Sequence, residues 1–224
     1  MSAFRMAIQA GADAIEFDVQ ASADGRLVVL HDATLDRTTD GAGAVFETDW
    51  SVIERLDAGA WFSPRFVNER VPSLDQVLSL DNVELELELK GYGEQFLERV
   101  IGEVHAGDAL ARVEFTSGNV LLLASLKRLV PVARIGLFSM RQPSWMPDSV
   151  FEHHIVGTAT TSGADVAHVH AANLTPQISR RLHDLGFQVH ANDAVSAEDV
   201  RRAIHADADR ISVNDVDLAR RLIA

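Results

Sequence analysis

The sequence predicts an α/β fold built from parallel strands, most simply a (β/α)8 barrel. Short apolar or alternating segments take turns along the chain with segments of helical periodicity. Seven such strand segments are present, and the chain opens on a helix that no strand precedes. Eight strands close a barrel, so we expect a (β/α)8 barrel that lacks its first strand.

The order of the elements follows from periodicity. A first helix is expected before Gly11, because Ala3, Phe4, Ala7 and Ile8 form one apolar stripe. The predicted strands are residues 14–19, 83–89, 112–115, 132–138, 165–170, 187–191 and 209–213. Helical patterns occupy residues 94–106, 119–130, 175–186, 196–206 and 216–224. A doubly wound sheet would also accommodate seven strands, but no Gly-rich phosphate motif follows the first of them.

We predict a single domain over residues 1–224. A chain of this length with 47% hydrophobic residues can bury one sizeable core. The connection from residue 33 to residue 72 is long and carries Gly41, Gly43, Gly59 and the aromatic segment "WFSPRF". We expect this connection to form a small inserted subdomain after the second barrel strand.

The composition narrows the possible partners. A net charge of -13 gives no basic surface for nucleic acid, because phosphate-backbone binding needs clustered Lys and Arg. Without cysteine, metal ligands have to be carboxylates, histidines or backbone groups. No segment approaches the roughly 18 apolar residues of a membrane span, so we expect a cytoplasmic protein that acts on a small molecule.

Acidic residues follow one face of two predicted strands. Side chains two apart on a strand share a face, so Glu16 and Asp18 point together from "AIEFDV". The same spacing places Glu88 and Lys90 together at the end of "VELELELK". Barrel active sites lie at the C-terminal ends of strands, and converging carboxylates raise one another's pKa unless a cation neutralises them. Glu16, Asp18 and Glu88 therefore predict a site for a hard divalent ion, Mg2+ or Ca2+.

Alternating acidic residues are also typical of solvent-facing strands. This alternative is strong for "ELELEL" alone, and we expect Glu84 and Glu86 to be structural or solvated. It is weaker for "IEFDV", because acidic residues are disfavoured in strands and are seldom buried without partners. We therefore favour the metal site.

His31 is the candidate acid/base group. The segment "SADGRLVVLHD" predicts a tight turn at Asp24 and Gly25 and a short strand that returns His31 toward Glu16 and Asp18. A single histidine is more often a surface residue, but a neighbouring anionic site suits His31 to proton transfer.

Together these residues resemble the glycerophosphodiester phosphodiesterases. The family pattern "GAD.IE.DV" followed by "DG..VV.HD..L.RTT...G" is matched by "GADAIEFDVQASADGRLVVLHDATLDRTTDGAG". The later steps "VPSLDQVLSL" and "ELELK" match a Pro-x-Leu entry to a helix and an "EIK"-like segment. Agreement over the long first segment is very unlikely by chance.

The resemblance implies a fold, a reaction and roles. The fold would be a TIM barrel, and the reaction would be hydrolysis of a glycerophosphodiester to glycerol 3-phosphate and an alcohol, within lipid and glycerol metabolism. Glu16, Asp18 and Glu88 would bind the metal. His31 would be one of two acid/base histidines, and Lys90 would lie near the phosphate and its developing charge.

The chain departs from the family pattern in two places. The His-Arg-Gly and Glu-Asn-Thr block that opens the family is not in this sequence, so we expect little activity from residues 1–224 alone, owing to a truncated start. The alternative is a degenerate homologue that binds a phosphodiester or a metal ion without turnover. The segment "HAND" from His190 stands where the family has a Trp motif; His190 would either line the mouth of the site or be a plain polar substitution.

A third hypothesis is a barrel of the sugar-phosphate isomerase type. Such a barrel binds phosphate at its last two strands and needs a Gly-rich loop there. The segments "HANDAVS" and "SVNDVDL" provide none.

Overall fold

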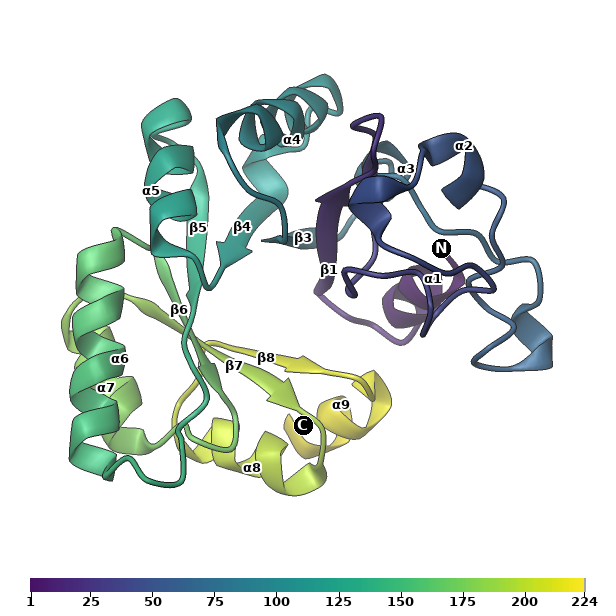
Figure 1. Ribbon diagram of the computed structural model, residues 1–224. Coiled ribbons are helices and arrows are strands. Elements are labelled where there is room, and N and C mark those ends of the chain that lie inside the picture. Colours follow the sequence, from purple (N-terminus) through teal and green to yellow (C-terminus); the bar gives the residue numbers. More distant parts are fainter. Residues whose placement is uncertain (224) are drawn as a thin grey trace. The chain divides into compact units, whose positions relative to one another are not determined.

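The structure is a computed structural model and describes residues 1–223 (Figure 1). It divides into two compact units, with the boundary between Val113 and Glu114. Strands and helices alternate along the chain, except that two consecutive strands of the first unit form a hairpin. All seven strands predicted from periodicity are present, so the α/β class and the order of its elements follow from the pattern.

The sheet of the first unit has β1 (Ala14–Ala21) at its centre. β2 (Leu27–Val29) pairs antiparallel with β1, and β3 (Glu84–Leu89) pairs parallel with it. Gly25 lies in the turn between β1 and β2 with φ +83°, a conformation that glycine adopts without strain. The predicted hairpin is therefore confirmed.

Helices of the first unit precede, connect and follow these strands. They are α1 (Ser2–Gln9), α2 (Trp50–Ile53), α3 (Leu74–Leu78) and α4 (Glu94–Ala106), with 3-10 turns at Val45–Glu47, Pro64–Phe66 and Leu110–Arg112. α4 coincides with its prediction because its apolar stripe is clear: Phe96, Leu97, Val100 and Val104 are all buried.

The two faces of β1 differ as the alternation predicts. Ile15, Phe17 and Val19 are buried, and the Phe17 ring meets Phe4 of α1 edge-on with centroids 6.0 Å apart. Burying each such side chain contributes about 1.5–3 kcal/mol, so the apolar face fixes which way the strand points. The acidic side chains are left on the other face.

The segment from residue 33 to residue 72 has a small core of its own within the first unit. Leu35, Val45, Ile53 and Val71 are buried together with Val28 and Leu30 from the β2 region. Its backbone is closed by turns rather than by long helices or strands. This packing is consistent with the expected small subdomain attached to the β1–β2 hairpin.

The second unit carries a run of parallel strands. They are β4 (Val113–Ser117), β5 (Arg134–Phe138), β6 (Val166–His170), β7 (Gln188–Ala194) and β8 (Arg210–Val213). Each of β5 to β8 pairs parallel with the strand before it in the sequence. The register shifts between Ala191 and Ala194, where Asp193 adopts φ +56°.

Helices of the second unit connect these strands and line one side of them in Figure 1. They are α5 (Val120–Leu129), α6 (Asp148–Ser162), α7 (Pro176–Asp184), α8 (Ala197–His205) and α9 (Val216–Ile223). One core cluster joins Phe151 and Ile155 of α6, Val169 of β6 and Leu182 of α7. Among residues 1–223, no helix is long and apolar enough to cross a membrane.

Candidate active site

Three of the predicted site carboxylates come together in the first unit. The parallel register of β1 and β3 places Asp18 directly beside Glu88 and Glu16 beside Glu86. One carboxylate oxygen from each of Glu16, Asp18 and Glu88 lies within 4.8 Å of the others. The pair Asp18 and Glu88 lies toward the C-terminal ends of both strands, which is where enzymes of this fold class build their sites.

Lys90 lies between two of these carboxylates. Its Nζ is 2.7 Å from Glu88 Oε1 and 3.1 Å from Asp18 Oδ1. Its backbone N–H donates to the Val19 carbonyl at 2.9 Å, which extends the β1–β3 pairing by one residue. The ammonium group is therefore fixed by the strand ends rather than by a flexible loop.

The electrostatics of this cluster favour a further cation. The pKa of Glu16 is raised to about 9, first because surrounding protein removes water from the carboxyl group and then because neighbouring carboxylates repel its charge. Glu16 also keeps an exposed surface, so the repulsion is the better supported of these causes. Burial also raises the pKa of Glu88, against the opposing effect of Lys90.

The pKa of Lys90 is raised. Burial alone would lower it, but the hydrogen bond to Glu88 and the charge of Asp18 outweigh that effect. Lys90 is therefore a stable positive charge. One ammonium faces three carboxylates here, and this excess of negative charge is what a hard divalent ion requires.

His31 is held near the end of β1 by backbone contacts. Leu30 N–H donates to the Asp18 carbonyl at 3.1 Å, and the Gln20 side-chain amide donates to the carbonyls of Leu30 and Asp32 at 2.7 Å each. The imidazole is 65% exposed. Among residues 1–223 its side-chain partner is Asp32, and no hydrogen bond or ion pair joins it to the three carboxylates.

Asp32 and Arg37 determine the state of the His31 ring. His31 Nδ1 lies 2.7 Å from Asp32 Oδ1, and Arg37 binds both Asp32 oxygens at 2.6 Å. The two Arg37 contacts, followed by the hydrogen bond from His31, hold the pKa of Asp32 well below its usual range. An ionised Asp32 only accepts, so Nδ1 carries the proton and the opposite nitrogen, Nε2, is available for proton transfer.

A second group of ionisable side chains lies in the second unit, and the sequence did not indicate it. Glu114 of β4, His168 of β6 and His190 of β7 are all buried. His168 Nε2 donates to Glu114 Oε1 at 2.7 Å, and its ring lies 4.4 Å from that of His190. His190 is thus buried and packs against the His168 ring. The segments "VAHVH" and "FQVHA" each contain a histidine, but only the pairing of the two strands shows that His168 lies beside His190.

Glu114 is balanced by cations. Arg134 Nε lies 2.8 Å from Glu114 Oε2, and Arg210 lies 3.9 Å from the same oxygen. Burial alone would raise the pKa of Glu114, but the His168 hydrogen bond and nearby positive charge hold it below its ordinary value. Gly136 of β5 makes room for this contact, since a Cβ there would lie 2.5 Å from both Glu114 Oε1 and His168 Nε2. We read this group as structural.

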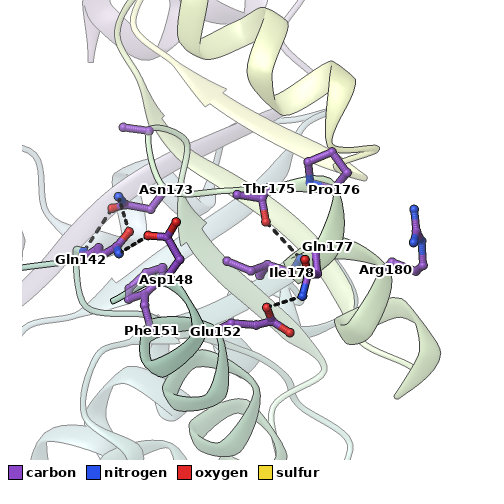
Figure 2. A pocket seen from close by; sticks show the side chains of 11 residues that line it. Gln142, Asp148, Phe151, Glu152, Asn173, Thr175, Pro176, Gln177, Ile178 and Arg180 are labelled. Atoms are coloured by element: carbon purple, nitrogen blue, oxygen red, sulfur yellow. Dashed lines mark hydrogen bonds between the residues drawn. The ribbon is translucent and has the colours of Figure 1, made fainter. Parts of the chain in front are cut away.

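The second unit also has a pocket of about 620 Å³ between α6 and the start of α7. Figure 2 shows that its polar side chains bond to one another: Gln142 donates to Asp148, and Gln177 donates to Glu152. None of the predicted site residues lines it. Several of its polar side chains therefore pair with one another, and the three carboxylates described above lie outside it.

Comparison with known proteins fits this arrangement. The family model described as "Glycerophosphoryl diester phosphodiesterase family" matches residues 1–218. The chain belongs to this family. The members are hydrolases by name, so the predicted enzyme class and the resemblance are both confirmed.

Individual relatives of the glycerophosphoryl diester phosphodiesterase family agree. A glycerophosphodiester phosphodiesterase of Caldanaerobacter subterraneus subsp. tengcongensis is 31% identical over 100% of this chain and 90% of its own length. The crystal structure of a glycerophosphodiester phosphodiesterase from Agrobacterium tumefaciens str. C58 is 29% identical, covers 97% of this chain and 90% of its own, and has a TM-score of 0.80.

A further solved structure supports the fold alone. A phosphodiesterase of Oleispira antarctica, solved with the product sn-glycerol-3-phosphate, is 24% identical, with a TM-score of 0.81 over 97% of this chain and 87% of its own. These likenesses confirm the predicted α/β fold class of the phosphodiesterase TIM-barrel type.

Proposed function

We propose that the protein hydrolyses glycerophosphodiesters to glycerol 3-phosphate and an alcohol, with a divalent cation bound by Glu16, Asp18 and Glu88. The observation that supports this proposal most is the convergence of the three carboxylates beside Lys90 at neighbouring strand ends. The family membership supplies the substrate class.

The donor set suits Mg2+ or Ca2+. Carboxylate oxygens are the ligands that these hard ions prefer, and burial followed by repulsion from neighbouring carboxylates raises the pKa of Glu16 and Glu88, a cost that a bound cation would offset. When bound, such an ion supplies charge stabilisation for the phosphoryl oxygens. The proposal includes both Mg2+ and Ca2+, because oxygen ligands suit either ion.

The protein's own residues have separate tasks in this proposal. Lys90 holds positive charge beside the phosphate and stabilises the negative charge that develops on its oxygens. Asp32 keeps the His31 Nδ1 proton in place, so that Nε2 moves a proton to the leaving alcohol oxygen or from the attacking water. Arg37 holds Asp32 through two hydrogen bonds and so orients the His31 ring indirectly, through Asp32.

The test is hydrolysis of glycerophosphocholine by residues 1–224 and by a version extended at its N-terminus with the family's His-Arg-Gly and Glu-Asn-Thr block, each with Mg2+, with Ca2+ and with a chelator. We expect turnover to require the ion and His31→Ala to lower kcat by about 10²–10⁴-fold. His153→Ala, at an exposed histidine on α6, is the matched control and should leave kcat unchanged. Turnover that persists in the chelator would contradict the metal role.

The non-catalytic alternative makes a different prediction. A degenerate homologue would bind Mg2+ or Ca2+ through the same carboxylates without turnover. Calorimetric titration of the ion, run beside the activity assay, distinguishes the two: binding that is lost in Glu88→Gln, with no turnover even in the extended version, favours the alternative.

A further inference from the structure

A rigid loop in the first unit presents aromatic side chains to solvent. We define the aromatic loop as residues 58–69, with the sequence "AGAWFSPRFVNE". Trp61 is 51% exposed and Phe62 is 70% exposed. Exposed aromatic side chains that lie together are uncommon on soluble proteins and mark an interaction surface.

The aromatic side chains form one cluster. The Trp61 and Phe62 rings have centroids 5.7 Å apart, and those of Phe62 and Phe66 are 5.8 Å apart. The Arg65 guanidinium lies over the Phe66 ring, 5.7 Å from its centroid. The surface therefore consists of aromatic rings packed edge-on or tilted against one another, with one cation beside them.

The loop is held closed at its base. Asp57 accepts hydrogen bonds from the backbone N–H groups of Gly59, Ala60 and Asn68, and these bonds hold its pKa below the usual range. Ala58 N–H donates to the Glu69 carbonyl at 2.8 Å. The loop is thus pre-formed, and little conformational entropy is lost when its aromatic side chains meet a partner.

The polar groups of the aromatic loop are directed inward. Trp61 Nε1 donates to the Ala58 carbonyl at 3.0 Å, so the indole shows an apolar edge to solvent. Ser63 caps the short turn Pro64–Phe66 with its hydroxyl oxygen. From residue 58 to residue 67, Arg65 is the only charged side chain. Apart from the Arg65 guanidinium, which can stay at the polar boundary, this surface therefore places few polar groups where they would lose water.

We propose that the aromatic loop docks on a zwitterionic lipid bilayer surface. Trp and Phe with an Arg beside them are residues that segments lying in the membrane–water interface use. The chain's net charge of -13 opposes binding to anionic lipid, which selects a zwitterionic headgroup.

Self-association through this loop is less favourable. A stable protein interface buries about 800 Å² per partner, whereas an aromatic side chain offers about 150–250 Å² even when it is fully buried. Trp61, Phe62 and Phe66 are each partly covered already, so the three together fall short of that area. Two copies would also bring together two strongly negative chains.

The test is co-sedimentation of the protein with phosphatidylcholine vesicles. We expect wild type to bind, and Trp61→Ala/Phe62→Ala to reduce partitioning by about tenfold. Trp145→Ala is the matched control, because Trp145 is 75% exposed but joins no aromatic cluster among residues 1–223. Brominated phosphatidylcholine should quench wild-type tryptophan fluorescence more than that of Trp61→Phe.

Four outcomes would overturn the proposal. Wild type that does not bind phosphatidylcholine vesicles, or double-variant partitioning equal to wild type, excludes lipid docking by this loop. A wild-type dimer in sedimentation velocity that Trp61→Ala/Phe62→Ala dissociates, without vesicle binding, assigns the surface to a second copy. A raised KM for soluble glycerophosphocholine in the double variant, again without vesicle binding, assigns it to the substrate. Circular dichroism and the thermal midpoint check that the variant is folded.

Discussion

The carboxylate cluster of the first unit and the Glu114 group of the second unit use similar residues in opposite ways. At Glu16, Asp18 and Glu88 the carboxylates outnumber the cations, and Lys90 is the cation that touches two of them. The Glu114 carboxylate, by contrast, contacts the Arg134 and Arg210 guanidinium groups and the His168 imidazole. Both groups bring ligand atoms close together.

The balance of carboxylates and cations therefore distinguishes a candidate active site from a structural network. The closeness of ligand atoms alone does not distinguish them. An excess of carboxylate at strand ends is unstable without a cation, which makes it a suitable place for catalysis. A buried carboxylate that cationic side chains already neutralise needs no bound metal ion, and its role is to join strands. The predictions that follow test this contrast from the largest expected effect to the smallest.

Glu88→Gln should lower kcat/KM for glycerophosphocholine by about 10³-fold, because it removes one proposed metal ligand and one partner of Lys90. Glu84→Gln on the same strand is the control, since Glu84 is exposed at the opposite strand end. Steady-state kinetics at saturating Mg2+ or Ca2+ provide the measurement. Equal activity of the two variants would remove Glu88 from the site.

Glu114→Gln should lower the free energy of unfolding by about 3 kcal/mol, because it leaves the positive charge of Arg134 poorly compensated. Glu198→Gln is the control: Glu198 pairs with Arg202 on the surface, and its loss should cost about 0.5 kcal/mol or less. Urea denaturation measures both. If Glu114→Gln proved as stable as Glu198→Gln, the structural role assigned to Glu114 would be wrong.

Gly136→Ala should destabilise the protein by about 1–3 kcal/mol, because its Cβ would meet Glu114 Oε1 and His168 Nε2 at 2.5 Å. Gly157→Ala in α6 is a matched control, since a Cβ there meets no atom within 4 Å. Alanine in a helix interior is favoured over glycine by about 0.5–1 kcal/mol, so that variant should be neutral or stabilised. Thermal midpoints compare the two, and equal losses would contradict the crowding.

The smallest expected effect is the change in stability at acidic pH. The pKa of Glu114 is lowered in the folded state from an ordinary value of 4.5, so its contribution is present above pH 4.5 and is lost as the pH falls below that value. The difference in unfolding free energy between wild type and Glu114→Gln should therefore narrow as the pH falls below 4.5. Urea midpoints taken at several pH values test it; a gap that widens toward acid would reverse the sign.

Much of the fold could be predicted because its elements are strongly periodic. The helix Glu94–Ala106 coincides with its apolar stripe, and the hairpin turn at Gly25 follows from local chemistry. The helix Asp148–Ser162 is less apparent, since β-branched residues and Gly157 interrupt its pattern. Tertiary packing of Phe151 and Ile155 decides that helix.

The candidate site was predictable to the extent that one strand pair forms it. The spacing in "IEFDV" and "ELELELK" already places Glu16, Asp18, Glu88 and Lys90 on their faces, and the structure supplies the register that joins them. Glu114, His168 and His190 come from three strands, so no local spacing could bring them together. The role of Arg37 also depends on a contact that spacing does not specify.

The pairing of β1 with β3 has a consequence for folding. The strands are joined by more than sixty residues, and their register sets like charges side by side, Glu16 with Glu86 and Asp18 with Glu88. Such cross-strand pairs oppose association, and the long loop adds an entropic cost. The apolar face must therefore drive this step, and a slip of one residue would set leucines against carboxylates on both faces. The register that brings the proposed metal ligands together is thus formed against repulsion between the paired carboxylates.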